Sequence, residues 1–233
     1  MNKIESFFLD LEKLSTRVSP AELAKAKAFD RHWSKRAFDL LVAVPLTIIL
    51  LPFFGFFALL ISIDSPGPAF YTQDRVGRYG KIIKIIKFRS MRIDIDDRMH
   101  QEHIKAYANG HLNLENGNKI VDDPRVTRVG RFLRRTSIDE FPQLFNVLKG
   151  EMSLVGPRPV PVYEVDEYKL WQSERLNSLP GMTGLWQVTR RGLSTFDEQL
   201  RLDIRYIHNQ SMWLNIKLLL LTIPAVISKA GAK

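Results

Sequence analysis

The chain has 233 residues, of which 45% are hydrophobic and 25% are charged, so it is long and apolar enough to form a core. This composition excludes a disordered tail and a small disulfide-stapled protein. Lysine and arginine number 34 against 25 acidic residues, and the formal net charge of +9 favours an anionic partner: nucleic acid, an anionic membrane face or a phosphate-bearing substrate. Since the sequence contains no cysteine, it cannot form a thiolate zinc site or use a thiol nucleophile.

Residues 1–36 are predicted to form a helical N-terminal extension. Apolar residues recur at helical spacing between Ile4 and Leu14, a pattern typical of an amphipathic helix that either lies at a membrane surface or packs on the domain. The sequence Ser19-Pro20-Ala21-Glu22 matches a capping box with proline at the first helical position, which predicts a second helix.

Residues 37–64 are predicted to form a membrane helix. Leu40 through Ile63 are 24 residues without a charged side chain. A helix of that length reaches about 36 Å, against a bilayer core of roughly 30 Å. Pro45 and Pro52 each remove an intrahelical hydrogen bond, so we expect a bend. Basic residues flank both ends, which places both ends in the cytoplasm and favours a re-entrant helix; a single span with a proline kink is the alternative.

Residues 65–233 are predicted to form a domain on the cytosolic face of the membrane. Turn-forming residues at 64–68 mark its start, and residues 69–71 and 81–89 have the composition of two β-strands. Seven basic residues and no acid lie between Arg75 and Arg92. Such a run is either a phosphate-binding surface or an ordinary solvated face.

Two further segments have alternative interpretations. Residues 93–122 are polar and predict a helix start followed by a mobile loop; a metal site at His100, His103 and His111 is disfavoured because no carboxylate pattern completes a ligand set. The apolar stretch 218–228 is too short to span a bilayer. With Trp213 and flanking lysines it fits a helix at the lipid surface, and a C-terminal core helix is the alternative.

The acidic pair Asp139 and Glu140 is the strongest candidate for chemistry. The apolar spacing from Phe141 to Leu148 predicts a helix that begins near Ser137 and stops at Gly150. Thr136 with Asp139, and Ser137 with Glu140, match the spacing of a capping box, so the acids could serve the helix alone.

Arginines on both sides favour a catalytic role for this pair instead. Arg131, Arg134 and Arg135 precede it, and Arg158 follows in a Gly-Pro-Arg-Pro sequence. Guanidinium groups beside a helix N-terminus attract phosphate. A carboxylate in that place can hold a divalent cation or attack a phosphorus atom.

At these residues the sequence resembles the bacterial sugar transferase family, the monotopic polyprenol-phosphate phosphoglycosyl transferases. The resemblance runs from about Lys35 to the C-terminus. It is carried by the motifs at 87–91, 123–127, 130–140, 146–159 and 180–184.

The resemblance implies a ping-pong transfer of a phosphosugar from a UDP-sugar to undecaprenyl phosphate, with release of UMP and with magnesium as cofactor. It implies that Asp139 is the nucleophile and that Glu140 is the partner acid, either a metal ligand or a proton acceptor. Lys87 and Arg134 match basic positions near the phosphates, and Arg158 and Arg191 match positions that hold the nucleotide sugar. Residues 189–192 depart from the family's commoner Asn-Gly-Arg run, so Arg190 is an alternative to Arg191.

The resemblance also bears on the membrane segment. Family members break their apolar helix at a Ser-Pro pair, and the matching pair here is Leu51-Pro52, so the break must rest on proline geometry. We therefore expect an α+β fold: a mostly helical membrane-associated domain with a re-entrant helix broken at Pro52, amphipathic interfacial helices and a small β-sheet.

The implied location is the cytoplasmic face of a bacterial inner membrane. The expected partners are the UDP-sugar, undecaprenyl phosphate and membrane lipid but no nucleic acid, and a homodimer stays open. Two other functions remain as alternatives. One is a membrane-tethered basic binding module for nucleic acid or anionic lipid, and the other is a membrane nucleotide-sugar hydrolase.

Overall fold

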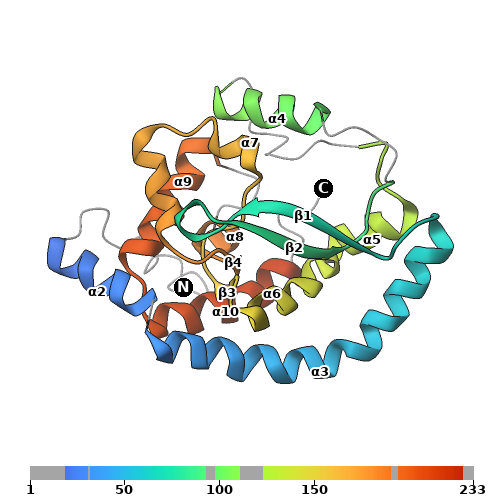
Figure 1. Ribbon diagram of the computed structural model, residues 1–233, viewed down its shortest axis with the longest axis horizontal. Helices are drawn as coiled ribbons and strands as arrows, with labels where there is room; N and C mark the ends of the chain where they lie inside the picture. The colour runs from blue at the N-terminus through green and yellow to red at the C-terminus, as the bar shows by residue number, and fades with distance from the viewer. Residues whose placement is uncertain (1–18, 31, 93–97, 111–122, 190–193, 228–233) are drawn as a thin grey trace, which may run out of the picture.

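The computed structural model describes residues 19–30, 32–92, 98–110, 123–189 and 194–227. Over these ranges the chain is mostly helical with two small two-stranded sheets, which confirms the α+β class (Figure 1). The amphipathic helix predicted near the N-terminus, His111 and Arg191 lie outside the described residues.

Helix α2 (Pro20–Asp30) begins at Pro20, as the capping pattern predicts. Asp30 ends this helix and is buried, 2.8 Å from the Lys35 ammonium and 3.1 Å from the Arg78 guanidinium. Burial opposes ionisation of Asp30, but the charge of Lys35 and the hydrogen bonds from Lys35, Ser178 and Arg78 lower the pKa of this carboxyl below its ordinary value. The helix is thereby fixed to the rest of the domain.

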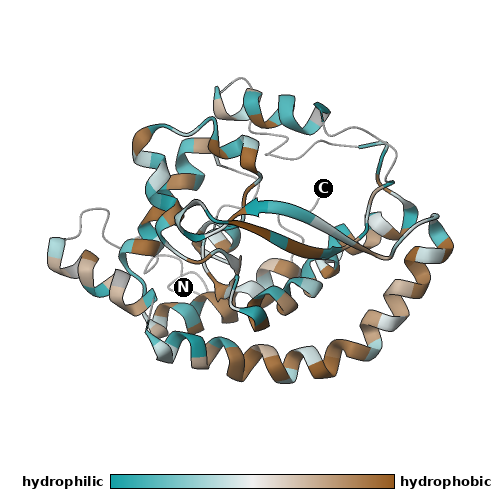
Figure 2. Cartoon of the chain, viewed as in Figure 1, coloured by the Kyte–Doolittle hydropathy of each residue, from teal (hydrophilic) through white to brown (hydrophobic). Residues whose placement is uncertain are grey.

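Helix α3 (Trp33–Asp64) is continuous over 32 residues and contains both Pro45 and Pro52. The membrane helix expected at 37–64 is therefore part of a longer element that begins at Trp33. Figure 1 shows α3 curving under the domain and rising at its C-terminal end, and Figure 2 shows that it is coloured mainly as hydrophobic. The helix is long and apolar enough to cross a membrane, and only 17% of its most apolar window is buried.

The N-terminal end of α3 is bonded to the domain. Arg36 donates hydrogen bonds to the carbonyl oxygens of Val147 (2.5 Å) and Leu148 (2.7 Å). The buried Asp39 carboxylate accepts hydrogen bonds from the Ser153 hydroxyl and the Leu154 amide, both at 3.0 Å. Polar residues of α3 therefore attach this end of the helix to the domain. A wholly apolar helix could not form these hydrogen bonds.

The C-terminal end of α3 is bonded to the same domain. The Asp64 carboxylate accepts a hydrogen bond from the Val129 amide at 2.9 Å. Beyond the helix, the Arg89 guanidinium donates to the carbonyl oxygens of Ser65 (2.6 Å) and Pro66 (2.8 Å). Both ends of the apolar helix are therefore held by one domain, and the apolar middle lies between them.

The two strands predicted in the basic region form an antiparallel hairpin. Strand β1 (Phe70–Val76) pairs with β2 (Ile82–Phe88), with Phe70 opposite Phe88 and Val76 opposite Ile82. The first strand is longer than the predicted 69–71. A short 3₁₀ helix, η1 (Arg78–Gly80), joins the strands, and Tyr79 there adopts a φ of 59°.

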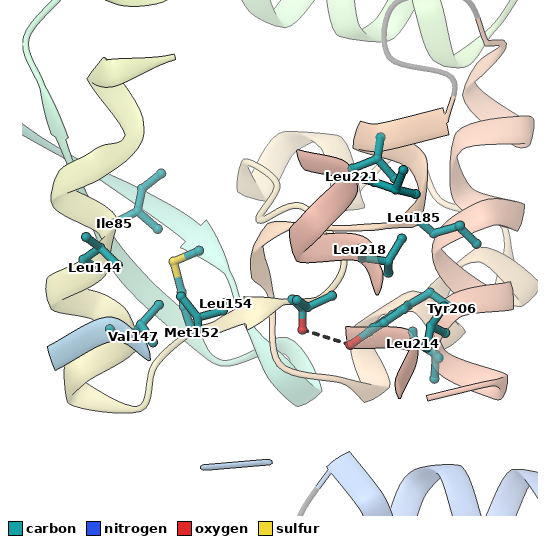
Figure 3. Packing of buried hydrophobic residues seen from close by; sticks show 14 of the residues in the cluster. Ile85, Leu144, Val147, Met152, Leu154, Leu185, Tyr206, Leu214, Leu218 and Leu221 are labelled. Carbon is teal, nitrogen blue, oxygen red and sulfur yellow. Dashed lines mark hydrogen bonds between the residues drawn. The ribbon is translucent and has the colours of Figure 1, made fainter. Parts of the chain in front are cut away.

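A second, parallel pair of strands lies in the core. Strand β3 (Ser153–Val155) pairs with β4 (Gly181–Thr183). Figure 3 shows the surrounding buried side chains, among them Met152 and Tyr206, and the hydrogen bond that the Tyr206 hydroxyl donates to the Val155 carbonyl oxygen at 2.9 Å. This core fixes the loop that follows β3, which carries Arg158.

The C-terminal helix α10 (Met212–Ile227) packs in the core on one face, which confirms the core-helix interpretation, whereas its position at a lipid surface stays a prediction. Leu218 and Leu221 on one face are buried in the core, whereas Trp213, Leu220 and Ile223 are exposed. The described residues also form α4 (Arg98–Ala108), α7 (Val162–Val165), η4 (Leu170–Asn177), α8 (Leu185–Thr189) and α9 (Phe196–His208), together with the helices of the candidate site given below.

Candidate active site

The acidic pair lies on a 3₁₀ helix rather than at the start of an α-helix. Helix α5 (Arg128–Thr136) ends at Ser137, whose left-handed φ of 57° breaks the chain direction. Asp139 and Glu140 then occupy the first turn of η3 (Ile138–Gln143), and α6 (Leu144–Lys149) follows and stops at Gly150 as predicted. The helix predicted from Ser137 is confirmed, but its first part is 3₁₀ because Pro142 has no amide to bond with the Ile138 carbonyl.

The capping-box interpretation of the acids, by contrast, is wrong. The Thr136 hydroxyl donates to the carbonyl oxygens of Phe132 and Leu133 within α5, at 2.9 and 3.1 Å. Ser137 makes no side-chain cap hydrogen bond to η3. Neither predicted cap therefore needs Asp139 or Glu140 as its reciprocal acid.

Helix α5 is held close to the end of β2. The Thr127 side chain caps α5 by accepting a hydrogen bond from the Gly130 amide at 3.0 Å. A Cβ at Gly130 would lie only 2.0 Å from the Ser90 carbonyl oxygen, so only glycine permits this approach. Arg134 and the acidic pair are thereby placed beside the end of β2.

Asn146 on α6 joins the acidic segment to β2. Its side chain is fully buried, accepts a hydrogen bond from the Ile86 amide at 3.0 Å and donates to the Lys84 carbonyl oxygen at 2.7 Å. Its amide also donates to the Glu151 carboxylate at 2.7 Å. Asn146 therefore fixes α6 against the backbone on both sides of Ile85, and β2 carries Lys87. Asn146 begins one of the motifs that carry the family resemblance, but nothing in its spacing predicts these hydrogen bonds, because an asparagine in a helix has no distinguishing pattern.

Glu140 is ion-paired with two of the predicted basic residues. The Arg158 guanidinium faces its carboxylate with Nη2 at 2.7 Å from Oε1 and Nη1 at 3.4 Å from Oε2. Lys87 Nζ lies 3.2 Å from the same Oε1. The negative charge of Glu140 raises the pKa of Arg158, whereas burial and the nearby Arg158 and Arg75 lower the pKa of Lys87. Lys87 and Arg158 therefore both lie beside the Glu140 carboxylate, where several positive charges are gathered.

Asp139 is different from its neighbour. Among the described residues its carboxylate has no hydrogen bond or ion pair, although Lys87, Arg134 and Arg158 are near enough to lower its pKa. Burial and the negative charge of Glu140 outweigh them, and the pKa of Asp139 is raised to about 6. At neutral pH the Asp139 side chain is therefore mainly ionised. It is also partly exposed.

These residues line one cavity of about 590 Å³. Its walls include Lys87 on β2, Arg134 on α5, the acidic pair on η3 and Arg158 after β3, so five of the six predicted catalytic and substrate-binding residues meet there. Further basic residues of the lining are Arg75, Arg89, Arg92 and Arg125. The basic run of the hairpin is therefore not merely a solvated face. A cavity of this size and charge suits a phosphorylated small molecule.

Arg158 is held from behind by a buried ionic cluster. Arg175 on η4 is 1% exposed and donates from Nη2 to the Arg158 carbonyl oxygen at 2.8 Å. Its Nε lies 2.7 Å from the Asp203 carboxylate and its Nη1 lies 3.4 Å from Glu164. This cluster could not be predicted from the sequence, because its members come from three helices and have no common motif.

The donor set fits magnesium that is bound together with a phosphorylated substrate. Mg²⁺ in proteins is commonly held by one or two carboxylates, waters and substrate phosphates. Within the described ranges no group of three or more acidic or histidine side chains is close enough to hold a metal by itself. Both Glu140 oxygens already face Arg158, so Asp139 is the better placed ligand.

The remaining candidates have other outcomes. His100 does not join a metal site in the described part of the chain, and its Nδ1 forms a hydrogen bond with the Tyr163 hydroxyl. Arg191 lies outside the described residues, as does its alternative Arg190. Pro52 lies inside the continuous α3, so the break predicted there is not observed as an interruption of the helix.

The sequence motifs and this geometry agree with a comparison against protein families. The model of the family described as bacterial sugar transferase matches residues 30–229. The chain belongs to the bacterial sugar transferase family. The match includes both α3 and the acidic cavity.

Curated relatives extend the comparison. An undecaprenyl-phosphate galactose phosphotransferase of Salmonella typhimurium is 38% identical over 227 residues, which cover 97% of this chain and 46% of the relative. The exopolysaccharide production protein ExoY of Sinorhizobium fredii is 39% identical over 85% of this chain and 88% of the relative. A UDP-glucose:undecaprenyl-phosphate glucose-1-phosphate transferase of Escherichia coli is 38% identical over 81% of this chain and 39% of the relative. The chain thus spans less than half the length of two of these relatives and 88% of the length of the third.

Proposed function

We propose that this chain is a phosphoglycosyl transferase that moves a hexose 1-phosphate group from a UDP-sugar to undecaprenyl phosphate, at an early membrane step of polysaccharide synthesis. The observation that carries the proposal is the position of Asp139. Its carboxylate is ionised at neutral pH, lies beside Lys87, Arg134 and Arg158, and opens into a cavity of about 590 Å³. The printed names of the galactose and glucose relatives support the lipid phosphate acceptor.

In the first half-reaction Asp139 acts as the nucleophile. A carboxylate oxygen attacks the phosphorus atom that carries the sugar, forms an O–P bond, and displaces UMP with the bridging oxygen. Lys87, Arg134 and Arg158 neutralise negative charge that grows on the phosphoryl oxygens. Asp139 suits this role better than Glu140, whose oxygens are paired with Arg158 and Lys87.

In the second half-reaction the lipid phosphate takes the place of UMP. An oxygen of undecaprenyl phosphate attacks the same phosphorus atom, the bond to Asp139 breaks, and the carboxylate is regenerated. The products are undecaprenyl-diphosphate-sugar and free enzyme. Because the leaving group of each step is an anion, neither step needs a general acid strong enough to protonate an alkoxide.

Magnesium is the proposed cofactor. When bound, it would supply charge neutralisation for the diphosphate, and Asp139 together with the substrate phosphates would hold it. Chelation with EDTA should abolish UMP release, and added Mg²⁺ should restore it. Unchanged UMP release in EDTA would contradict this cofactor assignment.

The membrane geometry fits a lipid-linked acceptor. Both ends of α3 are bonded to the domain through Arg36 and Asp64. This attachment fits a re-entrant helix, which enters one leaflet and returns to the same side of the membrane. Trp213, Leu220 and Ile223 on α10 provide exposed apolar side chains for an interfacial position. We infer that the enzyme sits on the cytoplasmic face of a bacterial inner membrane. There it would meet the polyprenyl phosphate at the surface and the soluble nucleotide sugar from the cytoplasm.

A single assay separates this function from its two alternatives. The enzyme in nanodiscs is incubated with UDP-galactose or UDP-glucose, with and without undecaprenyl phosphate, and UMP and lipid product are measured. The transferase produces stoichiometric lipid-linked sugar and continuous UMP release only with the acceptor. A hydrolase releases sugar phosphate without it, and a binding module releases no UMP at all.

A further inference from the structure

One wall of the catalytic cavity has a different character from the basic wall. It is formed by His100 and Ile104 of α4, Trp186 of α8 and Gln199 of α9, whereas the acidic pair lies on η3 next to α5. Figure 1 shows α8 and α9 near one end of the β1–β2 hairpin and α5 near the other. The cavity therefore extends along the hairpin, from the acidic pair at one end to this wall at the other. Among the described residues, α8 and α9 contribute no charged side chain to the wall.

Gln199 is the unusual residue of this wall. It is 3% exposed, and its side-chain oxygen Oε1 has no hydrogen-bond partner among the described residues. Buried polar atoms are nearly always paired, since an unpaired one loses its water without compensation. Gln199 lines the cavity of about 590 Å³, and although this oxygen is itself buried, rotation of the carboxamide would turn it toward a bound molecule.

Two aromatic hydrogen-bond donors, of which Trp186 lines the same cavity as Gln199, already have other acceptors. The Trp186 indole is 3% exposed and donates to the Ser194 hydroxyl oxygen at 2.8 Å. The Tyr107 hydroxyl donates to the Ser194 carbonyl oxygen at 2.7 Å. Both aromatic donors are therefore already used, and the Trp186 indole adds apolar surface to the lining of the cavity.

We propose that Gln199 Oε1 accepts a hydrogen bond from an uncharged N–H or O–H group of the nucleotide sugar, with Trp186 packed against the same part of the ligand. This inference rests on the proposed function. The phosphates of such a ligand bind at Lys87, Arg134 and Arg158 on the basic wall. The parts left for the wall that contains Trp186 and Gln199 are the base and the sugar, and each has a suitable donor: the imide N–H of uracil or a sugar hydroxyl.

Gln199 would then contribute to substrate selection. A site built to bond a particular donor discriminates strongly against a ligand that lacks it, because the buried acceptor stays unpaired. If the donor is a sugar hydroxyl, Gln199 distinguishes hexoses that differ at that position. If it is the imide, Gln199 distinguishes uridine nucleotides from cytidine nucleotides, whose ring nitrogen has no proton there.

The test uses Gln199→Leu and Gln199→Met in the full chain in nanodiscs. Gln187→Leu is the matched control, because Gln187 also has a buried unpaired Oε1 among the described residues but does not line the cavity. Three quantities are measured: the KM for UDP-galactose and UDP-glucose in UMP release, the Kd for UMP by calorimetry, and the thermal unfolding midpoint. Loss of one net hydrogen bond should raise KM about tenfold with kcat little changed.

The two sources of the donor give different results. If the base is bonded, the Kd for UMP rises by the same factor as KM; if a sugar hydroxyl is bonded, KM rises while the Kd for UMP is unchanged. Either result supports the inference, provided that Gln187→Leu leaves KM unchanged. Removing an unpaired buried oxygen should leave the unfolding midpoint of the Gln199 variants unchanged or higher.

The inference is overturned if a folded Gln199 variant keeps the wild-type KM and the wild-type Kd for UMP. A lower unfolding midpoint with unchanged KM would overturn it as well, because Gln199 would then be purely structural. These outcomes leave the transferase proposal intact. A wild-type protein that neither releases UMP from UDP-sugars nor binds UMP would instead remove the proposed function, and this inference with it.

Discussion

Arg158 and Glu140 face each other through both arms of the guanidinium, with Nη2 at 2.7 Å from Oε1 and Nη1 at 3.4 Å from Oε2. This pairing separates the tasks of two adjacent acids. Glu140 holds Arg158 and Lys87 in place, which leaves the Asp139 carboxylate beside both cations without an ion pair of its own in the described part of the chain. Its negative charge also helps to raise the pKa of Asp139 to about 6.

The first prediction concerns the pH dependence of Glu140→Gln. In the wild type, kcat/KM for UMP release should fall as the pH drops through about 6, because protonated Asp139 cannot attack phosphorus. Removing the charge of Glu140 lowers the pKa of Asp139, so the acid limb of the variant should move to lower pH even though its maximal rate decreases. The measurement is kcat/KM from pH 4.5 to 8.

Glu174→Gln is the control for this profile, because Glu174 pairs with His208 at 2.9 Å and does not line the cavity. Its acid limb should coincide with that of the wild type. An acid limb of Glu140→Gln that stays in place or moves to higher pH would show that Glu140 does not set the ionisation of Asp139.

The hairpin and the meeting of the acids with arginines could be predicted from the sequence. The β-branched composition of residues 81–89 defines β2, and the short separation of Arg134 from Asp139 ensures that they are near each other. The 3₁₀ geometry of η3 was not predicted, although Pro142 was a visible signal for it. Periodicity and composition describe only a few consecutive residues. They therefore predict the structure correctly where it depends on residues that are close in the sequence.

Other parts of the site depend on contacts between distant residues. Asn146 bonds with Ile86, which is 60 positions away, and Arg175 bonds with Asp203, which is 28 positions away. No periodicity or motif encodes such pairs in one sequence. The role of Gln199 likewise follows from its unpaired oxygen and its place on the cavity wall, both of which require the fold.

The second prediction concerns the buried cluster behind Arg158. Arg175→Lys keeps a positive charge but cannot bond simultaneously with Asp203, Glu164 and the Arg158 carbonyl oxygen. Breaking a buried ionic cluster of this kind should lower the free energy of unfolding by about 3 kcal/mol. Denaturant unfolding monitored by tryptophan fluorescence measures the loss.

An exposed ion pair provides the contrast. Lys169 lies 3.8 Å from Asp197, and both side chains are largely accessible to solvent. Lys169→Ala should change the free energy of unfolding by less than about 1 kcal/mol. Equal losses for Arg175→Lys and Lys169→Ala would mean that the Arg175 cluster does not stabilise the domain.

The third prediction concerns the path of α3. Since the sequence contains no cysteine, single cysteines can be introduced at Ala28 before the helix, at Pro68 after it and at the exposed Leu170 of the domain. A re-entrant helix places all three on one side of the membrane. In intact cells a membrane-impermeant maleimide should label none of them, and after permeabilisation it should label all three.

A spanning helix gives a different labelling pattern. Ala28→Cys and Pro68→Cys would then differ, with one of them labelled in intact cells. That result would be incompatible with the attachment of both helix ends to one domain through Arg36 and Asp64.

The central claim is that Asp139 becomes covalently bonded to the phosphosugar. Intact-protein mass spectrometry after exposure to UDP-galactose or UDP-glucose, without acceptor, tests it most directly. The account predicts a mass gain of one phosphohexose in the wild type and in Asp74→Asn, an exposed control on β1, and no gain in Asp139→Asn. Undecaprenyl phosphate should then remove the added mass. Lipid product formed without any adduct, or an adduct that persists in Asp139→Asn, would contradict the account.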